Sequence, residues 1–145
     1  MKKFELTNEF ITNMFGTKLF RIRALVEFGD VEAGELGGYV EKESNLGHDD
    51  NAWVYGNALV CGDARVCGDA RVCGNGDYAY AHGFGSVNRT TTFFRLKDGG
   101  VGVRCGCFYG TLAQFRDKIR ETHGETKKAQ EYLMLADLMK LRFEK

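Results

Sequence analysis

A six-residue unit repeats four times between Val54 and Asp77, and it limits the possible folds more than any other feature. The units read Val-Tyr-Gly-Asn-Ala-Leu, twice Val-Cys-Gly-Asp-Ala-Arg, and Val-Cys-Gly-Asn-Gly-Asp. A short fixed period is typical of stacked architectures, because one unit cannot bury its own apolar face. The Gly-Asn and Gly-Asp pairs tolerate left-handed backbone angles, so they supply a bend every six residues. The sequence therefore predicts a triangular coil with three units in each turn.

The spacing within the units also predicts which side chains point into the coil. Val and Ala lie two residues apart across each junction, and such residues share one face of an extended chain. Degenerate units extend the coil over residues 36–81, a little over two turns, and open ends of such a stack need caps. The predicted inward columns contain Ala52, Val54, Ala58, Val60, Ala64, Val66, Ala70 and Val72.

The chain divides into three predicted segments. Residues 1–35 form an N-terminal β cap, with a half-buried strand over 18–26, and residues 36–90 form the coil and its exit. Residues 91–145 form a ββαα module. It contains a hairpin at Asp98-Gly99, a return strand over 101–108, a helix opened by the capping-box pair Thr111 and Gln114, and a final helix over 126–143. The predicted fold class is mainly β with C-terminal helices (α+β).

Composition and charge exclude several classes of function. The 145 residues contain no long apolar run and no secretory pattern, so we expect a cytoplasmic protein whose five cysteines are free thiols. Net charge is zero, but residues 1–53 sum to −4 and residues 91–145 to +4. Either the two parts dock on each other, or the basic part faces an anionic ligand. Duplex nucleic acid requires a stronger basic patch.

Several motifs resemble those of hexapeptide-repeat proteins of bacteriophages and prophages. They are TKLFRIRAL at 17–25, GELGGYV at 34–40, NAWV at 51–54 with the repeat units, TFFRLKDG at 92–99, RCGCFYG at 104–110 and EYLMLAD at 131–137. The resemblance covers nearly the whole chain, although this repeat tract is unusually short. It implies a left-handed β-helix, a homotrimer and a small phage accessory protein, and it supplies no catalytic residue.

The candidate ligand site consists of Trp53, Tyr55, Arg65 and Arg71. Trp53 and Arg71 are 18 residues apart, so they stack on one side of successive turns, and Arg65 occupies the corresponding position on the next side. If three chains pack side by side, Arg65 of one chain meets Arg71 of another. An aromatic platform with two guanidinium groups would hold a base and a phosphate. Alternatively, this ladder shields the coil and packs between subunits.

Other reactive residues give weaker predictions. Cys105 and Cys107 share one face of the predicted strand at a spacing of about 6.8 Å, which is poor for a disulfide and fits small apolar packing. A metal would need more ligands than His123 supplies, so we predict no metal site and no cofactor. His48, beside Asp49 and Asp50, is either the general base of a hexapeptide acyltransferase or part of a solvated turn.

The sequence favours a non-enzymatic binding protein from a phage. In its specific form, this hypothesis is an anti-defence protein that sequesters a small nucleotide immune signal in clefts between the subunits of a homotrimer. One alternative is a structural or protein-binding module that uses the C-terminal helix as its partner surface. A small acyltransferase is a further alternative.

Overall fold

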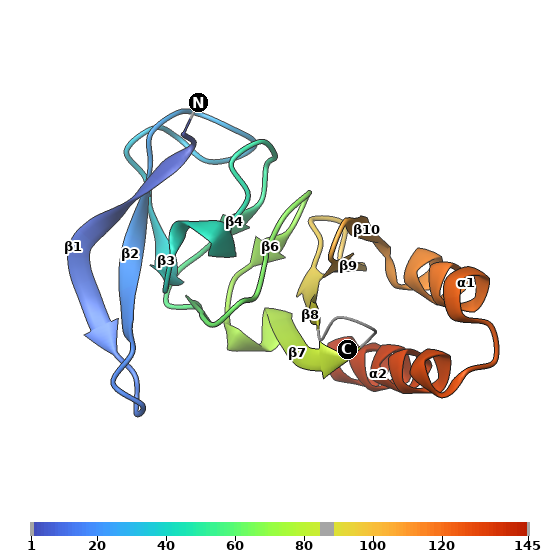
Figure 1. The fold of residues 1–145 in the computed structure, drawn as a ribbon. Helices are drawn as coiled ribbons and strands as arrows, with labels where there is room; N and C mark the ends of the chain where they lie inside the picture. Colours follow the sequence, from blue (N-terminus) through green and yellow to red (C-terminus); the bar gives the residue numbers. More distant parts are fainter. Residues whose placement is uncertain (1, 85–88, 145) are drawn as a thin grey trace.

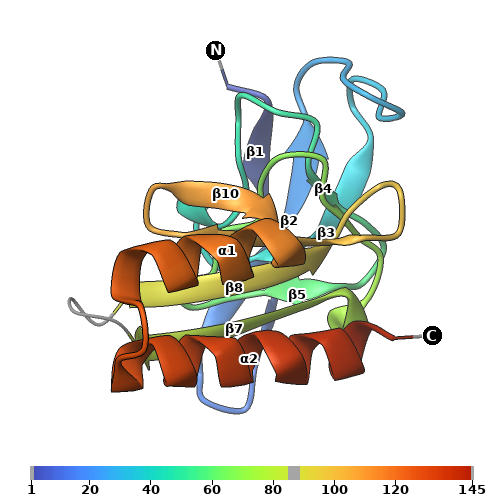
Figure 2. The ribbon, with the colours of Figure 1, turned by 90° about the vertical axis from the view of Figure 1, so that its right-hand side faces the viewer.

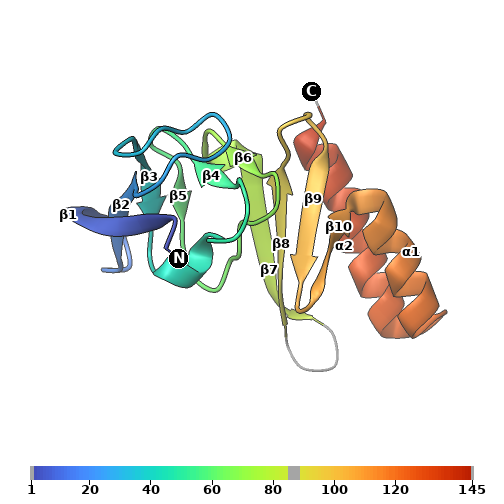
Figure 3. The ribbon, with the colours of Figure 1, turned by 90° about the horizontal axis from the view of Figure 1, so that it is seen from above.

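The fold is mixed α+β, as predicted, and it is arranged in three layers (Figures 1 and 3). A computed structural model describes residues 2–84 and 89–144. The first layer is an N-terminal hairpin with the stacked repeat units, the second is an antiparallel sheet, and the third is a pair of helices. Among the described residues, no helix has the length and apolar character needed to cross a membrane.

The N-terminal layer begins with the hairpin of β1 (Phe4–Thr12) and β2 (Lys18–Ala24). The strand predicted over residues 18–26 is therefore confirmed for most of its length. β3 (Leu36–Val40) pairs antiparallel with β2 and carries the chain into the repeat region. The hairpin thus covers one side of the coil, as a cap should.

The repeat region forms two stacked turns whose three sides pair in parallel. On the first side β3 pairs with β5 (Leu59–Val60), and on the second side Leu46 pairs with Val66. On the third side β4 (Trp53–Val54) pairs with β6 (Arg71–Val72). The side chains of all eight residues in the predicted inward columns are 2% exposed or less. The prediction that these eight side chains point into the coil is therefore confirmed.

The two turns differ in length. Trp53 pairs with Arg71, 18 residues further on, as the repeat predicts. Leu46 pairs with Val66, however, and Tyr39 with Leu59, both 20 residues further on. The first turn therefore contains two extra residues between Leu46 and Trp53. This longer corner holds His48, Asp49 and Asp50.

The predicted left-handed β-helix is not found as a closed solenoid in the described residues. After β6 the chain passes through a short 3-10 turn, η2 (Asn75–Asp77), and enters the next sheet. Ala70 pairs antiparallel with Leu96 of this sheet, where a third turn would pair in parallel. The sheet thus takes the place of further turns. The coil was predicted to continue to residue 81, but it ends after β6.

Two tyrosines from this sheet lie against corners of the second turn. Gly62 and Gly68 have φ angles of +66° and +67°, the left-handed conformation expected at the corners. A Cβ at Gly62 would lie 2.8 Å from the Tyr80 hydroxyl oxygen, and one at Gly68 would lie 1.9 Å from that of Tyr109. Glycine is therefore required at Gly68 for close packing as well as for backbone conformation.

The C-terminal module is larger than the predicted ββαα unit. Its sheet has the order β10-β9-β8-β7, with β7 at Tyr78–Phe84, β8 at Arg89–Arg95, β9 at Val101–Cys105 and β10 at Phe108–Thr111. The return strand predicted over 101–108 pairs with β8 as expected, but it ends at Cys105, because Gly106, with φ +59°, turns the chain between β9 and β10. As a result Cys105 is buried whereas Cys107 is exposed, and the two thiols do not share a face.

Two helices cover one face of this sheet (Figure 2). The first, α1 (Leu112–His123), opens with the predicted capping box of Thr111 and Gln114, and α2 (Lys127–Phe143) matches the predicted final helix. Adjacent residues on β8 point to opposite faces. Phe93 accordingly packs in the core beneath the helices, and Phe94 packs in the core of the stacked turns.

Candidate functional site: the arginine groove

Two adjoining cavities lie between the stacked turns and the C-terminal sheet, with volumes of about 500 and 390 Å³. Ser44, Arg65 and Arg104 line both of them. We call the two cavities together the arginine groove. The first cavity also contains Asp63, Thr90, Gly106 and Cys107, and the second contains Glu43, His48, Asp49 and Cys67.

Arg65 points outward from the second turn because its neighbours Ala64 and Val66 are fully buried inside it. Its backbone N–H donates to Thr92 Oγ1 at 2.9 Å, which ties this position to β8. Among the described side chains, none forms a hydrogen bond or ion pair with its guanidinium group. Arg65 therefore presents a guanidinium group with free N–H donors to the groove.

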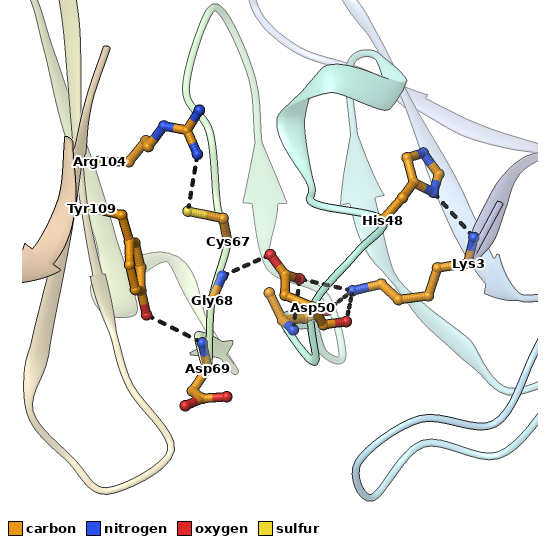
Figure 4. A network of polar contacts seen from close by, with 9 residues as sticks. Lys3, His48, Asp50, Cys67, Gly68, Asp69, Arg104 and Tyr109 are labelled. Atoms are coloured by element: carbon orange, nitrogen blue, oxygen red, sulfur yellow. Dashed lines mark hydrogen bonds and ion pairs between the residues drawn. The ribbon is translucent and has the colours of Figure 1, made fainter. Parts of the chain in front are cut away.

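Arg104 enters the groove from β9 and is held in place by neutral groups. Its Nε donates to the carbonyl oxygen of Gly106 at 2.7 Å, and its Nη1 lies 3.9 Å from Cys67 Sγ (Figure 4). A guanidinium group has five N–H donors, so most of them stay available for a ligand. Burial raises the pKa of the Cys67 thiol, against a smaller opposing effect of Arg104, so Cys67 stays a neutral thiol at pH 7.

The arginines of the groove differ from most others in the molecule. Ion pairs with carboxylates hold Arg21, Arg23, Arg71, Arg95, Arg116 and Arg120. Arg142 donates to the backbone carbonyls of Asn75 and Tyr78. Within the described side chains, Arg65 and Arg104 have no carboxylate partner. The groove thus contains the arginines without a carboxylate or backbone-anchored partner outside it, as far as the described side chains show.

Ser44 is placed in the groove by the short 3-10 turn η1 (Glu43–Asn45). The next residue, Asn45, is completely buried and anchors this turn. Its amide nitrogen donates to the carbonyl oxygens of Gly62 and Ala64 at 3.1 and 2.8 Å, while its Oδ1 accepts from the Lys42 N–H at 2.9 Å. The Ser44 hydroxyl is therefore carried by a rigid corner.

A buried lysine anchors the longer corner, whose residues His48 and Asp49 line the second cavity; Figure 4 shows the contacts of this lysine with Asp50. The Lys3 side chain is almost fully buried, and its Nζ donates to Ala52 O at 2.7 Å, Asp50 O at 3.0 Å and Asp50 Oδ1 at 3.2 Å. The other oxygen, Asp50 Oδ2, accepts from the Gly68 N–H at 2.7 Å. Asp50 in the longer corner thus joins the N-terminal cap to the second turn. Burial lowers the pKa of Lys3 despite this pairing.

His48 is constrained by the same corner. Its Nδ1 accepts a hydrogen bond from the Lys3 backbone N–H at 3.1 Å, and its ring stacks on Phe4 with centroids 4.3 Å apart. The neutral imidazole therefore carries its proton on Nε2, and the Nδ1 lone pair is occupied. This arrangement does not favour the general base of an acyltransferase.

The predicted ligand residues are not brought together in one place. Tyr55 and Arg71 line a separate cavity of about 240 Å³ that also contains Asp30 and Lys97. Arg71 forms an ion pair with Asp30 and lies over the Tyr55 ring at 5.8 Å. Burial raises the pKa of Tyr55, and Arg71 opposes this shift. Arg65 lies instead in the arginine groove.

The prediction that Trp53 points outward as an aromatic platform is wrong. Its side chain is 0% exposed, with the Phe4 and Phe28 rings at centroid distances of 6.4 and 5.3 Å. The physical reason is that Trp53 points away from the coil but into the N-terminal cap. No base can therefore stack on Trp53 in this structure.

Arg104 was not predicted as a site residue, although the sequence carried a signal for it. Alternation along residues 101–108 places Arg104 between two glycines on the face opposite Val103. Arg104 becomes part of a site only because this face of β9 packs against the stacked turns. In the part of the chain that the structure describes, the five cysteines are free and no cluster of metal-ligating side chains occurs.

Comparison with known protein families, curated proteins and solved structures finds no match for this chain.

Proposed function

We propose that this is a non-enzymatic binding protein that holds a small anionic molecule in the arginine groove. The observation that carries the proposal is the pair Arg65 and Arg104, which line one groove without a carboxylate partner among the described side chains. Guanidinium groups match phosphate and carboxylate oxygens geometrically. A hydrogen bond to a charged group stabilises a complex by about 1.5–3 kcal/mol, so two arginines suffice for measurable binding.

Two of the three carboxylates that line the groove are paired with lysines, and the third, Asp49, forms no ion pair with Arg65 or Arg104 within the described part of the chain. Asp63 pairs with Lys42 at 2.8 Å, and Glu43 pairs with Lys2 at 2.9 Å. The Lys42 hydrogen bond holds the pKa of Asp63 below its usual range. Each of these carboxylates thus has its own lysine, and the arginines are left to the ligand.

A nucleotide is the specific ligand we propose, in keeping with a phage anti-defence protein that sequesters a nucleotide signal. The groove lies within one chain, so this form of the proposal needs no cleft between subunits. It also needs no tryptophan platform. Phosphate oxygens would lie against Arg65 and Arg104, and ribose or base donors against the carboxylates and hydroxyls of the groove.

The proposal is tested by incubating the protein with a mixed nucleotide pool at low salt, washing it, denaturing it and identifying released molecules by mass spectrometry. We expect one or a few phosphorylated species from the wild type and much less from Arg65→Gln. Arg71→Gln is the matched control, because Arg71 lies in the other cavity and is paired with Asp30. Equal recovery from all three proteins would place the binding elsewhere.

We also propose that the protein self-associates, with a homotrimer as the expected form. Support comes from α2, where Met134, Leu138 and Leu141 lie three or four residues apart and are 71, 53 and 67% exposed. Light scattering at micromolar concentration tests this. A single 16.2 kDa species would contradict it. If the protein does self-associate, the two stacked turns are a shortened hexapeptide β-helix that is stabilised by its caps and by its partner subunits.

A protein-binding module is the second candidate function. It is favoured by the tip of the β1–β2 hairpin, where Met14 and Phe15 are 88 and 85% exposed. Exposed apolar side chains at a projecting tip are suited to insertion into a partner. A Met14→Ser/Phe15→Ser variant that loses a cellular partner but keeps nucleotide binding would assign the two functions to different surfaces.

A further inference from the structure

We propose that the ligand of the arginine groove carries its negative charge in the middle, between two uncharged polar arms, as a phosphodiester joining two groups does. This inference rests on the proposed function and adds the chemical class of the ligand. Its first support is the position of the arginines. Arg65, Arg104 and Ser44 line both cavities, so they lie where the cavities meet.

The second support is the placement of the carboxylates. Asp63 lines only the first cavity, and Asp49 lines only the second. The pKa of Asp63 lies below its usual range because Lys42 donates to it, so Asp63 is ionised at pH 7. A carboxylate that is paired with a lysine still has lone pairs that accept hydrogen bonds from N–H and O–H groups, and an ionised phosphate has no such donor to offer. Both ends of the groove therefore select neutral arms with donors, and the junction selects the anion.

The third support is size. Each cavity alone, about 500 and 390 Å³, lies within the usual range for small-molecule sites. A ligand with a terminal phosphate at the junction would fill one cavity and leave the other to water. A ligand with a central phosphate fills both. Such a phosphodiester belongs either to a dinucleotide or to a single-stranded nucleic acid that crosses the groove.

Calorimetry at low salt with four probes tests this inference: inorganic phosphate, adenosine 5′-monophosphate, adenylyl-adenosine, and the same dinucleoside with a neutral methylphosphonate link. We expect adenylyl-adenosine to bind at least about ten-fold more tightly than the monophosphate, a difference of roughly 1.4 kcal/mol. The neutral analogue should lose this advantage. Equal or tighter binding of the monophosphate overturns the inference but keeps the proposed function. Failure of all charged probes overturns both.

Two variants that fill one cavity each make the test independent of the choice of base. Cys107→Trp fills the first cavity and Asp49→Trp the second, and both residues are exposed, so the fold should tolerate the changes. Each variant should reduce the affinity for adenylyl-adenosine to that for the monophosphate. Arg71→Gln should leave the affinities for both ligands unchanged. If one of the two variants leaves the dinucleoside affinity intact, its cavity holds no arm and the inference is wrong.

A ten-nucleotide single strand distinguishes the two sources of the phosphodiester. Affinity that rises with length beyond two nucleotides, with a steeper salt dependence, would identify a single strand. Affinity that stops rising at two nucleotides would identify a dinucleotide. Either result supports the inference that the ligand carries its negative charge between two uncharged arms.

Discussion

The molecule contains two cavities with arginine that differ in their electrostatics. In the smaller cavity, Arg71 pairs with Asp30, and Lys97 lies 3.8 Å from the same carboxylate. In the arginine groove, Arg65 and Arg104 have no such partner among the described side chains. Both Arg65 and Arg71 come from the same position of the repeat unit.

The difference shows that the surroundings of a repeat position determine its role. The third side of the coil packs beside the N-terminal cap, which supplies Asp30 from the loop after β2. The side that carries Arg65 packs against β8 and β9, which supply Thr92 and another arginine. An arginine at the same repeat position is therefore paired with a carboxylate on one side and, among the described side chains, left without one on the other.

The largest expected effect comes from breaking the scaffold that both cavities share. Val66 is completely buried in the second turn, so Val66→Asp should destabilise the fold by about 3 kcal/mol or more, because it buries an unpaired charge. Urea denaturation measures this. Arg65→Asp is the matched control, since it puts the same carboxylate one residue away but facing outward. Equal midpoints for the two variants would mean that the register is wrong.

The Lys3–Asp50 pair joins the N-terminal cap to the longer corner and the second turn, at one end of the arginine groove. Asp50→Ala should cost about 2 kcal/mol, because it leaves the Lys3 ammonium and the Gly68 N–H without this acceptor. Lys3→Met keeps the apolar contacts and removes the charge, so adding it to Asp50→Ala should restore part of the loss. Strictly additive destabilisation in a double-mutant cycle would show that the two side chains act independently.

Removing the carboxylate that pairs with Arg71 should make the smaller cavity resemble the groove. Asp30→Asn frees Arg71 and Lys97, so a second, weaker site for inorganic phosphate should become detectable by calorimetry. Added salt should weaken both sites, since the attraction is coulombic. An unchanged stoichiometry would show that the ion pair is not what keeps this cavity from binding anions.

The smallest expected effect concerns the thiols of the groove. Burial raises the pKa of Cys67, so its folded thiol keeps its proton at a pH where an unfolded thiol, of pKa about 8.5, loses it. The contribution of Cys67 to stability is therefore complete below pH 8 and decreases as the pH rises further. Alkylation followed by mass spectrometry at pH 8 should modify exposed Cys73 and Cys107 well before Cys67. Equal rates would contradict the burial of Cys67.

The period of the repeat was sufficient to predict the interior of the coil, because inward positions depend only on local alternation and corner glycines. The capping pair Thr111 and Gln114 likewise predicted the start of α1 from local chemistry. The strand β7 was missed, because residues 78–84 continue the repeat region in sequence but pair with β8 in space. Trp53 was misplaced for a similar reason, since a pattern that predicts the outside of a coil does not show what packs against it.

The candidate site was predicted only in part. Arg65 was identified from its outward position, whereas Arg104 depends on a contact between segments that lie far apart in sequence. The predicted partnership of Arg65 with Arg71 assumed a neighbouring chain, and within one chain the two lie in different cavities. Tertiary packing of the sheet against the turns thus decides which arginines lie in the same cavity.

Titration of the arginine side chains by NMR tests the central claim most directly. The ¹H–¹⁵N resonances of Arg Nε report on each guanidinium group, and they are assigned with Arg65→Gln, Arg71→Gln and Arg104→Gln. On addition of adenylyl-adenosine at low salt, the signals of Arg65 and Arg104 should shift together and saturate, while that of Arg71 stays in place. Shifts of Arg71 with no change at Arg65 and Arg104 would contradict the account.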